Sequence, residues 1–134
     1  MPTVSGPKRI RPRRRRRRLP CWTARKNAAN PPERGEVWLA DLGFAAKVRP
    51  VLVVSVPFAD SDYALIQSVP HTTQPRGAQF EVRLLVRFLQ DGAFNIQGML
   101  AVPSAKFLRR LGMLAPAEMS EVEVMIKRWM GLVG

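Results

Sequence analysis

Cysteine and histidine are almost absent from this chain of 134 residues, in which Cys21 and His71 are single occurrences. One cysteine cannot form an internal disulfide, and these two side chains do not make the ligand spacing of a zinc site. No apolar run approaches the roughly 20 residues of a membrane span, and no signal-peptide pattern follows the basic N-terminus. These absences exclude a disulfide-stapled secreted domain and predict a cytoplasmic protein that does not enter a membrane.

Acidic residues are absent before Glu33, whereas residues 1–32 contain 11 of the 22 Lys and Arg residues and half of the 12 prolines. Residues 33–134 hold the other 11 basic residues and all 10 acidic ones, so a fully cationic globule is excluded. Six consecutive arginines (13–18) repel one another, and the prolines interrupt any helix. We therefore expect a disordered extension over 1–32 and one domain over 33–134. The extension is either a nucleic-acid arm without sequence preference, a solvated tail, or the product of a misplaced translation start.

From Glu33 onward the pattern becomes that of β-strands. Alternating or β-branched segments predict strands near 35–42, 49–56, 63–69, 79–87 and 94–102, with no amphipathic helix between them. Such spacing favours a small closed or half-closed barrel. Two helices are expected after it, a short one over 105–111 capped by Ser104 and Gly112, and a longer one from Pro116 to Gly131. The longer helix carries an apolar stripe formed by Met119, Val122, Ile126 and Trp129.

Several motifs of enzyme chemistry are also missing. The chain has no phosphate loop of the Gly-x-x-x-x-Gly-Lys type, no dinucleotide fingerprint and no Gly-x-Ser-x-Gly elbow. Asp60 and Asp62 are a close acidic pair, but without a nearby histidine or third carboxylate they are more typical of a turn than of a metal site. We therefore expect neither a metal nor another cofactor.

Polar chemistry is concentrated at two predicted strand ends. Arg49 opens the most apolar strand, and residues 69–77 supply Thr72, Thr73, Gln74, an imidazole and a second guanidinium. If the two strands are neighbours, Arg49 and Thr72 can converge on one phosphate, since a guanidinium fork and a hydroxyl together donate several hydrogen bonds. The alternative from the residues alone is an ordinary strand-edge arginine and a turn whose hydroxyls cap backbone amides.

Five segments, in this order, resemble the MazF/PemK toxins of type II toxin–antitoxin systems. They are ERGEVWLADL (33–42), RPVLVVS (49–55), VPHTTQ (69–74), Gln97, and RRLGML (109–114) with a closing helix that ends in GLVG. The resemblance spans residues 33–134. It implies an SH3-like barrel with a C-terminal helix, a homodimer, and metal-independent cleavage of single-stranded RNA under the control of an acidic antitoxin.

The resemblance also implies a catalytic pair, which falls on Arg49 and Thr72. The ribose 2′-hydroxyl would attack its own phosphate, leaving a 2′,3′-cyclic phosphate and a 5′-hydroxyl. Arg49 would stabilise the charge on phosphorus and Thr72 would position the phosphate. Arginine is a poor base at its normal pKa, so another group or solvent must accept the proton.

Further RNA contacts are expected at His71, Thr73, Gln74, Arg76 and Gln97. His71 precedes Thr72 on a strand and should point to the opposite face, which favours a structural or stacking role over that of the base. Three features depart from the family: a short link over 43–48, Ile96 where some members carry an acid, and the arginine-rich extension. A non-catalytic SH3-like binding module and a degenerate toxin that only forms complexes remain alternatives.

Overall fold

The computed structural model describes residues 31–43 and 47–132. The predicted disordered extension, Cys21 included, lies outside these residues except for Pro31 and Pro32. The middle of the short link, residues 44–46, also lies outside them. Within the described ranges no helix has the length and apolar character of a membrane span.

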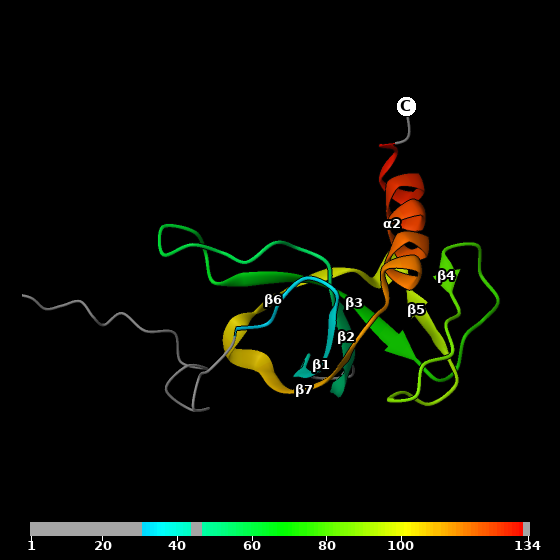
Figure 1. The fold of residues 1–134 in the computed structure, drawn as a ribbon, viewed down its shortest axis with the longest axis horizontal. Coiled ribbons are helices and arrows are strands. Elements are labelled where there is room, and N and C mark those ends of the chain that lie inside the picture. Colours follow the sequence, from blue (N-terminus) through cyan, green and yellow to red (C-terminus); the bar gives the residue numbers. More distant parts are fainter. Residues whose placement is uncertain (1–30, 44–46, 133–134) are drawn as a thin grey trace, which may run out of the picture.

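In the described part of the chain, seven strands form one antiparallel sheet (Figure 1). The spatial order is β4-β5-β3-β2-β1-β7, and β6 pairs with β3 beside this path. A helix, α2, follows the last strand. The predicted mainly-β fold with a C-terminal helix is therefore confirmed. The strands are β1 (Glu36–Asp41), β2 (Val48–Val53), β3 (Leu65–Thr72), β4 (Glu81–Val82), β5 (Ala93–Asn95), β6 (Leu100–Pro103) and β7 (Phe107–Met113); two 3₁₀ turns, η3 (Ile96–Gly98) and η4 (Ser104–Lys106), and α2 (Pro116–Met130) complete the elements.

Strand β3 connects the parts of the sheet because it pairs with three other strands. Residues 68–70 pair with β2, residues 65–68 pair with β6, and residues 71–72 pair with β5. The strand runs three residues beyond the predicted end at Val69 and so includes both His71 and Thr72. Thr72 therefore lies at the end of a strand that is hydrogen-bonded to three others in the described part of the chain.

The predicted helix over 105–111 is wrong. Only Ser104–Lys106 forms a helical turn, and Phe107–Met113 is strand β7, which pairs with β1. The physical reason is that β1 has an edge that must be paired, and Phe107, only 1% exposed, packs edge-on against Trp38 at 6.1 Å between ring centroids. Three strand predictions were also too long: the strand predicted over 49–56 ends at Val53, 79–87 contains only the two-residue β4, and 94–102 is split by η3.

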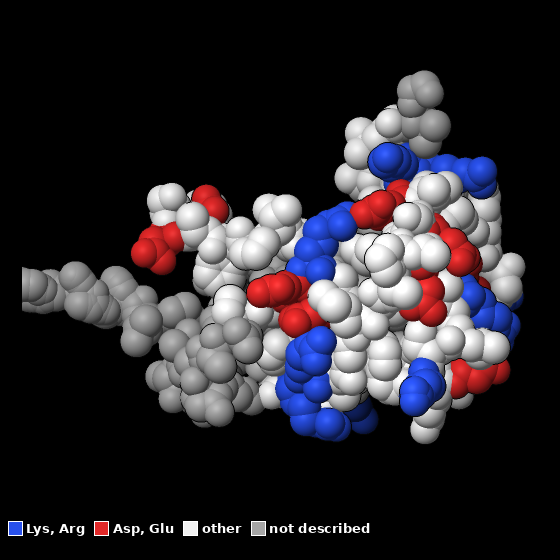
Figure 2. Space-filling model, viewed as in Figure 1, with Lys and Arg blue, Asp and Glu red and all other residues white. Residues whose placement is uncertain are grey.

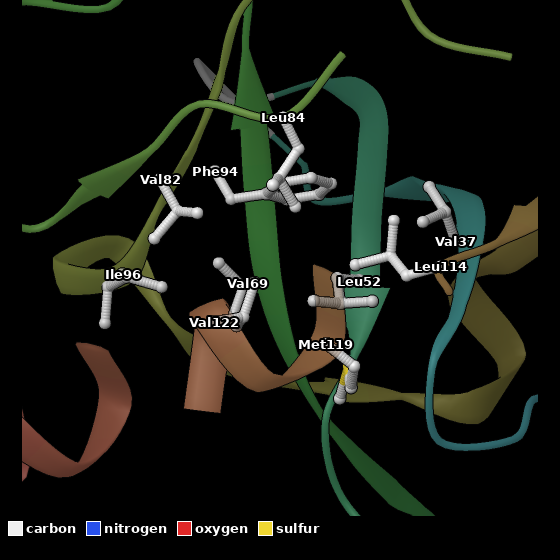
Figure 3. Close-up of a cluster of buried hydrophobic side chains, with 10 residues drawn as sticks. All are labelled: Val37, Leu52, Val69, Val82, Leu84, Phe94, Ile96, Leu114, Met119 and Val122. Carbon is white, nitrogen blue, oxygen red and sulfur yellow. The ribbon is translucent and has the colours of Figure 1, made fainter. Parts of the chain in front are cut away.

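Buried side chains form one cluster on each side of the central strands. The smaller cluster contains Trp38, Val51 and Phe107 among others. The larger one, drawn in Figure 3, gathers side chains from β1, β2, β3, β4, β5 and α2; its buried members are Val37, Leu52, Val69, Val82, Leu84, Phe94, Ile96, Leu114, Met119 and Val122. The alternation predicted for residues 35–42 is confirmed, since Val37 and Trp38 belong to different clusters.

Helix α2 covers the larger cluster as its sequence predicts. Pro116 occupies the first turn, and Gly131 ends the helix with φ of 72°. Met119 and Val122 are buried, whereas Trp129 is 43% exposed and packs its ring against Phe80 at 5.3 Å between centroids. The predicted apolar stripe therefore faces the sheet, and its last member lies at the rim.

A buried carboxylate joins the beginning of β1 to β7. Glu36 is 8% exposed, and its Oε1 accepts the backbone N–H of Glu33 and the indole N–H of Trp38, both at 2.9 Å. Its Oε2 accepts the Nε–H of Arg110 at 2.9 Å. Each polar atom of this buried group thus has a partner, as burial requires.

We expect Glu36→Ala to lower the free energy of unfolding by about 2 kcal/mol, because it leaves the Trp38 indole N–H without its acceptor and Arg110 without its partner. Urea denaturation measures the loss. The matched control is Glu123→Ala, which removes the pair with Arg34 at an exposed position and should cost about 0.5 kcal/mol. Equal losses in the two variants would contradict this role for Glu36.

Candidate active site

The sheet brings the strands of Arg49 and Thr72 side by side. Strands β2 and β3 are antiparallel neighbours, with Val51 opposite Pro70. Arg49 precedes Val51 by two residues and Thr72 follows Pro70 by two, so both lie beyond this pair at the same end of the two strands. On its other side Arg49 pairs with Ala40 of β1. The convergence inferred from the sequence thus has a direct basis in strand pairing.

The β1–β2 hairpin fixes the backbone of Arg49. Its ends are tied by two hydrogen bonds of 2.8 Å, from the N–H of Leu42 to the carbonyl of Lys47 and from the N–H of Lys47 to the carbonyl of Gly43. Pro50 follows as the third residue of β2, consistent with its predicted position near the beginning of the strand. Arg49 therefore extends from a short, hydrogen-bonded hairpin.

A pocket of about 600 Å³ lies at these strand ends. Five of the seven predicted site residues line it: Arg49, His71, Thr72, Thr73 and Gln74. The remaining lining residues come from β1, β2, β7 and the segment between β4 and β5; they are Leu39, Val48, Pro50, Phe88, Leu89, Gln90, Arg109 and Leu111.

Two predicted residues are not among the lining residues. Gln97 is exposed in η3. Arg76 is exposed in a turn organised by Glu81, whose carboxylate accepts the backbone N–H groups of Arg76, Gly77 and Ala78 at 2.8–3.1 Å. These hydrogen bonds, that of Arg76 first, lower the pKa of the Glu81 carboxyl.

The Thr72 hydroxyl is oriented by its own backbone. Its oxygen accepts the N–H of Gln74 at 3.1 Å. The amide cap considered from sequence is therefore present. A hydroxyl that accepts in this way still has its own hydrogen, which can be donated to a bound anion. This hydrogen bond therefore orients the Thr72 hydroxyl and leaves its hydrogen available for a ligand.

The pocket is cationic although the described body carries mixed charge. Its lining residues include two arginines, Arg49 and Arg109, and no Asp or Glu. Elsewhere, basic and acidic side chains are interspersed over the face shown in Figure 2. Arginine side chains and a hydroxyl in an acid-free hollow form a site for an anion such as a phosphate diester.

Sequence reasoning gave no role to Arg109, Phe88 or Gln90. Arg109 was assigned to the predicted helix, whereas in β7 it pairs with Leu39 next to the pocket. The side chains after Lys106 are compatible with a strand, which would have placed Arg109 in β7. The spacing of Phe107 and Leu111 also fits a helix, however, and the sequence alone does not decide between the two. Phe88 and Gln90 lie in a segment whose path no local pattern determines.

His71 lines the same pocket as Arg49 and Thr72. Its ring packs edge-on against Phe94 at 5.0 Å between centroids. Because His71 and Thr72 both line the pocket, the expectation from strand alternation that they point to opposite faces stays a prediction. His71 is only 3% exposed, and its Nε2 has no hydrogen-bond partner among the described residues. Burial lowers the pKa of the imidazole below the usual 6.5, and the Asp91 carboxylate partly opposes this shift.

This histidine should make the protein less stable in acid. Where the pH lies between the lowered pKa and about 6.5, the unfolded chain binds a proton at this position that the folded chain does not. The free energy of unfolding therefore rises with pH through that window and falls on acidification. His71→Phe, which retains an aromatic ring, should be more stable relative to wild type at about pH 5 than at about pH 7.5.

Urea denaturation of both proteins at the two pH values checks this expectation. Glu81 is common to both proteins and cancels in the comparison, because its lowered pKa affects stability only below the usual carboxyl range. A stability difference that is the same at both pH values would show that the imidazole titrates normally.

No group of three or more His, Cys, Asp or Glu side chains placed to hold a metal ion occurs among residues 31–43 and 47–132.

Comparison with protein families gives one match over residues 33–130, to the family described as "PemK-like, MazF-like toxin of type II toxin-antitoxin system". The chain belongs to this family. The matched range begins at Glu33, just before β1, and ends with the last residue of α2, so it includes every element of the PemK/MazF-like fold described above. A search of curated protein sequences gave no significant match.

Solved structures of MazF proteins share this fold. An endoribonuclease in complex with its cognate antitoxin, from a mycobacterial species, is 25% identical with a TM-score of 0.66, covering 77% of this chain and 98% of that one. The MazE–MazF complex of Deinococcus radiodurans is also 25% identical, with a TM-score of 0.62 over 76% of this chain and 97% of that one. The toxin MazF-mt6 of Mycobacterium tuberculosis, 22% identical, has the same fold with a TM-score of 0.63 over 74% and 99%.

Proposed function

We propose that this PemK/MazF-like toxin is a metal-independent endoribonuclease that cleaves single-stranded RNA. The observation that carries the proposal is the acid-free pocket that Arg49 and Thr72 line together, at the ends of two neighbouring strands. The related mycobacterial endoribonuclease, 25% identical to this chain, supports the same activity.

The proposed reaction is an internal transfer at one phosphate diester. The ribose 2′-oxygen attacks the adjacent phosphorus and loses its proton to solvent; the bond from phosphorus to the 5′-oxygen breaks, and that oxygen takes up a proton. The products are a 2′,3′-cyclic phosphate and a 5′-hydroxyl. Arg49 donates hydrogen bonds to the non-bridging oxygens as negative charge grows on them, and Thr72 donates its hydroxyl hydrogen to the same phosphate.

The remaining predicted RNA residues divide by position. Thr73 and Gln74 are exposed at the pocket and contact the RNA beside the cleaved bond. Arg76 and Gln97 lie outside the pocket lining and would contact more distant nucleotides. His71 is a buried residue of the pocket lining and supports the strand of Thr72 through the contact of its ring with Phe94.

The proposed partners are an acidic antitoxin and a second copy of the chain. A cationic pocket without acidic side chains complements an acidic antitoxin segment, and two of the related structures are complexes of a toxin with its antitoxin. We place the functional domain at residues 33–134. The arginine-rich residues 1–32 add affinity for any nucleic acid through phosphate contacts.

The direct test is to incubate the purified full chain with a long RNA transcript in EDTA and to analyse the ends. The proposal predicts fragments whose 5′ ends accept phosphate from a kinase without prior phosphatase treatment, and whose 3′ ends carry the cyclic phosphate. Intact RNA that is nevertheless shifted in a gel would favour the non-catalytic binding module instead. Cleavage that requires an added divalent ion would refute metal independence.

A further inference from the structure

One wall of the pocket has no role in the proposed reaction. It is formed by Phe88, Leu89 and Gln90, from the segment between β4 and β5, together with Arg109 and Leu111 of β7. These residues come from parts of the chain far from Arg49 and Thr72 in sequence, yet they border the same 600 Å³ hollow. An RNA bound with one phosphate at Arg49 and Thr72 must place a neighbouring nucleotide against some part of the lining.

The ring of Phe88 is held in place by a strand residue that has no side chain. A Cβ at Gly112 would lie 2.4, 2.5 and 2.7 Å from Cδ2, Cε2 and Cγ of that ring. The ring therefore lies directly against the backbone of β7, in space that any other residue would fill. Phe88 also packs against the edge of the larger core cluster. It is a half-buried aromatic ring at the pocket with a rigid support behind it.

The polar groups near this ring suit a nucleotide. Gln90 and Gln74 are exposed at the same pocket, and an amide both donates and accepts hydrogen bonds, as base edges do. Arg109 is exposed and forms no ion pair with the acidic side chains of the described ranges. A planar apolar surface, amides and an available guanidinium are the components with which proteins bind single-stranded nucleic acids.

We infer that this wall is a nucleotide subsite in which Phe88 stacks on a base flanking the cleaved bond and Arg109 contacts the adjacent phosphate. The inference rests on the proposed function for the identity of the ligand, single-stranded RNA. It adds a specificity-determining residue, since the base that stacks best on Phe88 and fits the two amides will be preferred at that position.

Binding of oligonucleotides that cannot be cleaved tests the subsite. The probes are nine-nucleotide 2′-O-methyl oligo-A, oligo-C and oligo-U, and a sugar–phosphate oligomer of the same length without bases; homopolymers make the binding register irrelevant. Wild-type protein should bind the probes with bases more tightly than the abasic one. Phe88→Leu should reduce that advantage by about 10-fold, the size of one stacking contact, and leave abasic binding unchanged. Phe88→Tyr should retain it.

The expected phosphate contact of Arg109 is tested by the salt dependence of binding. Arg109→Ala should weaken all four probes alike and make the dependence of log Kd on log salt shallower by about 0.7, the contribution of one phosphate contact in a single strand. Phe58→Leu and Arg128→Ala are matched controls outside the pocket. If Phe88→Leu does not fold by circular dichroism, Phe88→Met replaces it, because methionine fills the space without an aromatic face.

A base-dependent advantage that is unchanged in Phe88→Leu or its replacement would overturn the stacking role, and an unchanged salt slope in Arg109→Ala would overturn the phosphate contact. None of these measurements requires cleavage. A wild-type protein that cuts no RNA would therefore refute the proposed function alone, whereas a cleaving enzyme with insensitive Phe88 and Arg109 variants would refute the subsite alone.

Discussion

Arg49→Ala should reduce the rate of RNA cleavage by about 1,000-fold, because it removes the guanidinium donors that stabilise charge on the phosphate oxygens in the transition state. Arg49→Lys should restore little of this loss, since an ammonium lacks the planar fork that matches two phosphate oxygens. Single-turnover cleavage of an end-labelled transcript measures the rates. Because the effect is on the chemical step, it should remain at saturating protein.

Arg128→Ala is the control for this comparison, since it removes an exposed arginine at the end of α2. Thr72→Val tests the partner residue by removing its hydroxyl at nearly constant shape. Cleavage by the Arg49→Ala protein at the wild-type rate would end the assignment of this pocket as the catalytic site, whatever else in the molecule cuts RNA.

Gly92→Ala should both destabilise the protein, by about 3 kcal/mol, and abolish cleavage. A Cβ at this position would lie 2.1 Å from the carbonyl oxygen of Thr72 and 2.8 Å from Cε1 of His71. The nearest atom belongs to the backbone, so no side-chain rotation relieves the clash. The pairing of Thr72 with Ala93 must open, and Thr72 then leaves its place in the pocket that Arg49 also lines.

Gly98→Ala is the matched control, because the atom nearest to its added Cβ is Nδ2 of the Asn95 side chain, 2.8 Å away, which can move. Thermal unfolding and the cleavage assay report the two effects separately. If Gly92→Ala and Gly98→Ala lose similar stability and both still cut RNA, the backbone of β3 is not the element that positions Thr72.

The strands that carry Arg49 and Thr72 could be predicted because local pattern and tertiary burial agree there. After Arg49 and Pro50, the residues Val51, Leu52 and Val53 are apolar and buried, with Leu52 in one side-chain cluster and Val51 and Val53 in the other. Helix α2 could also be predicted, because Pro116 and Gly131 mark its ends in the sequence. Each of these segments has a structure that its own residues favour.

The pocket wall formed by residues 88–90 together with Arg109 and Leu111 could not be predicted, for two physical reasons. Residues 107–113 form a strand because β1 offers an unpaired edge, and such long-range pairing overrides a weak helical spacing. The segment from Arg83 to Gly92 has little regular structure, and its position depends on Phe88 lying over Gly112, a contact between residues 24 positions apart. No local pattern reports a contact of that kind.

The lining of the pocket, which contains two arginines and no acidic side chain, bears on which solution variable should govern the proposed binding of RNA. A guanidinium is in general charged throughout the physiological pH range, and burial lowers the pKa of His71, which lines the same pocket. We therefore expect pH to alter the attraction for phosphate less than salt does within the ordinary cellular range. Ionic strength screens this attraction over about 10 Å, so we expect binding of a phosphate diester to weaken as salt rises.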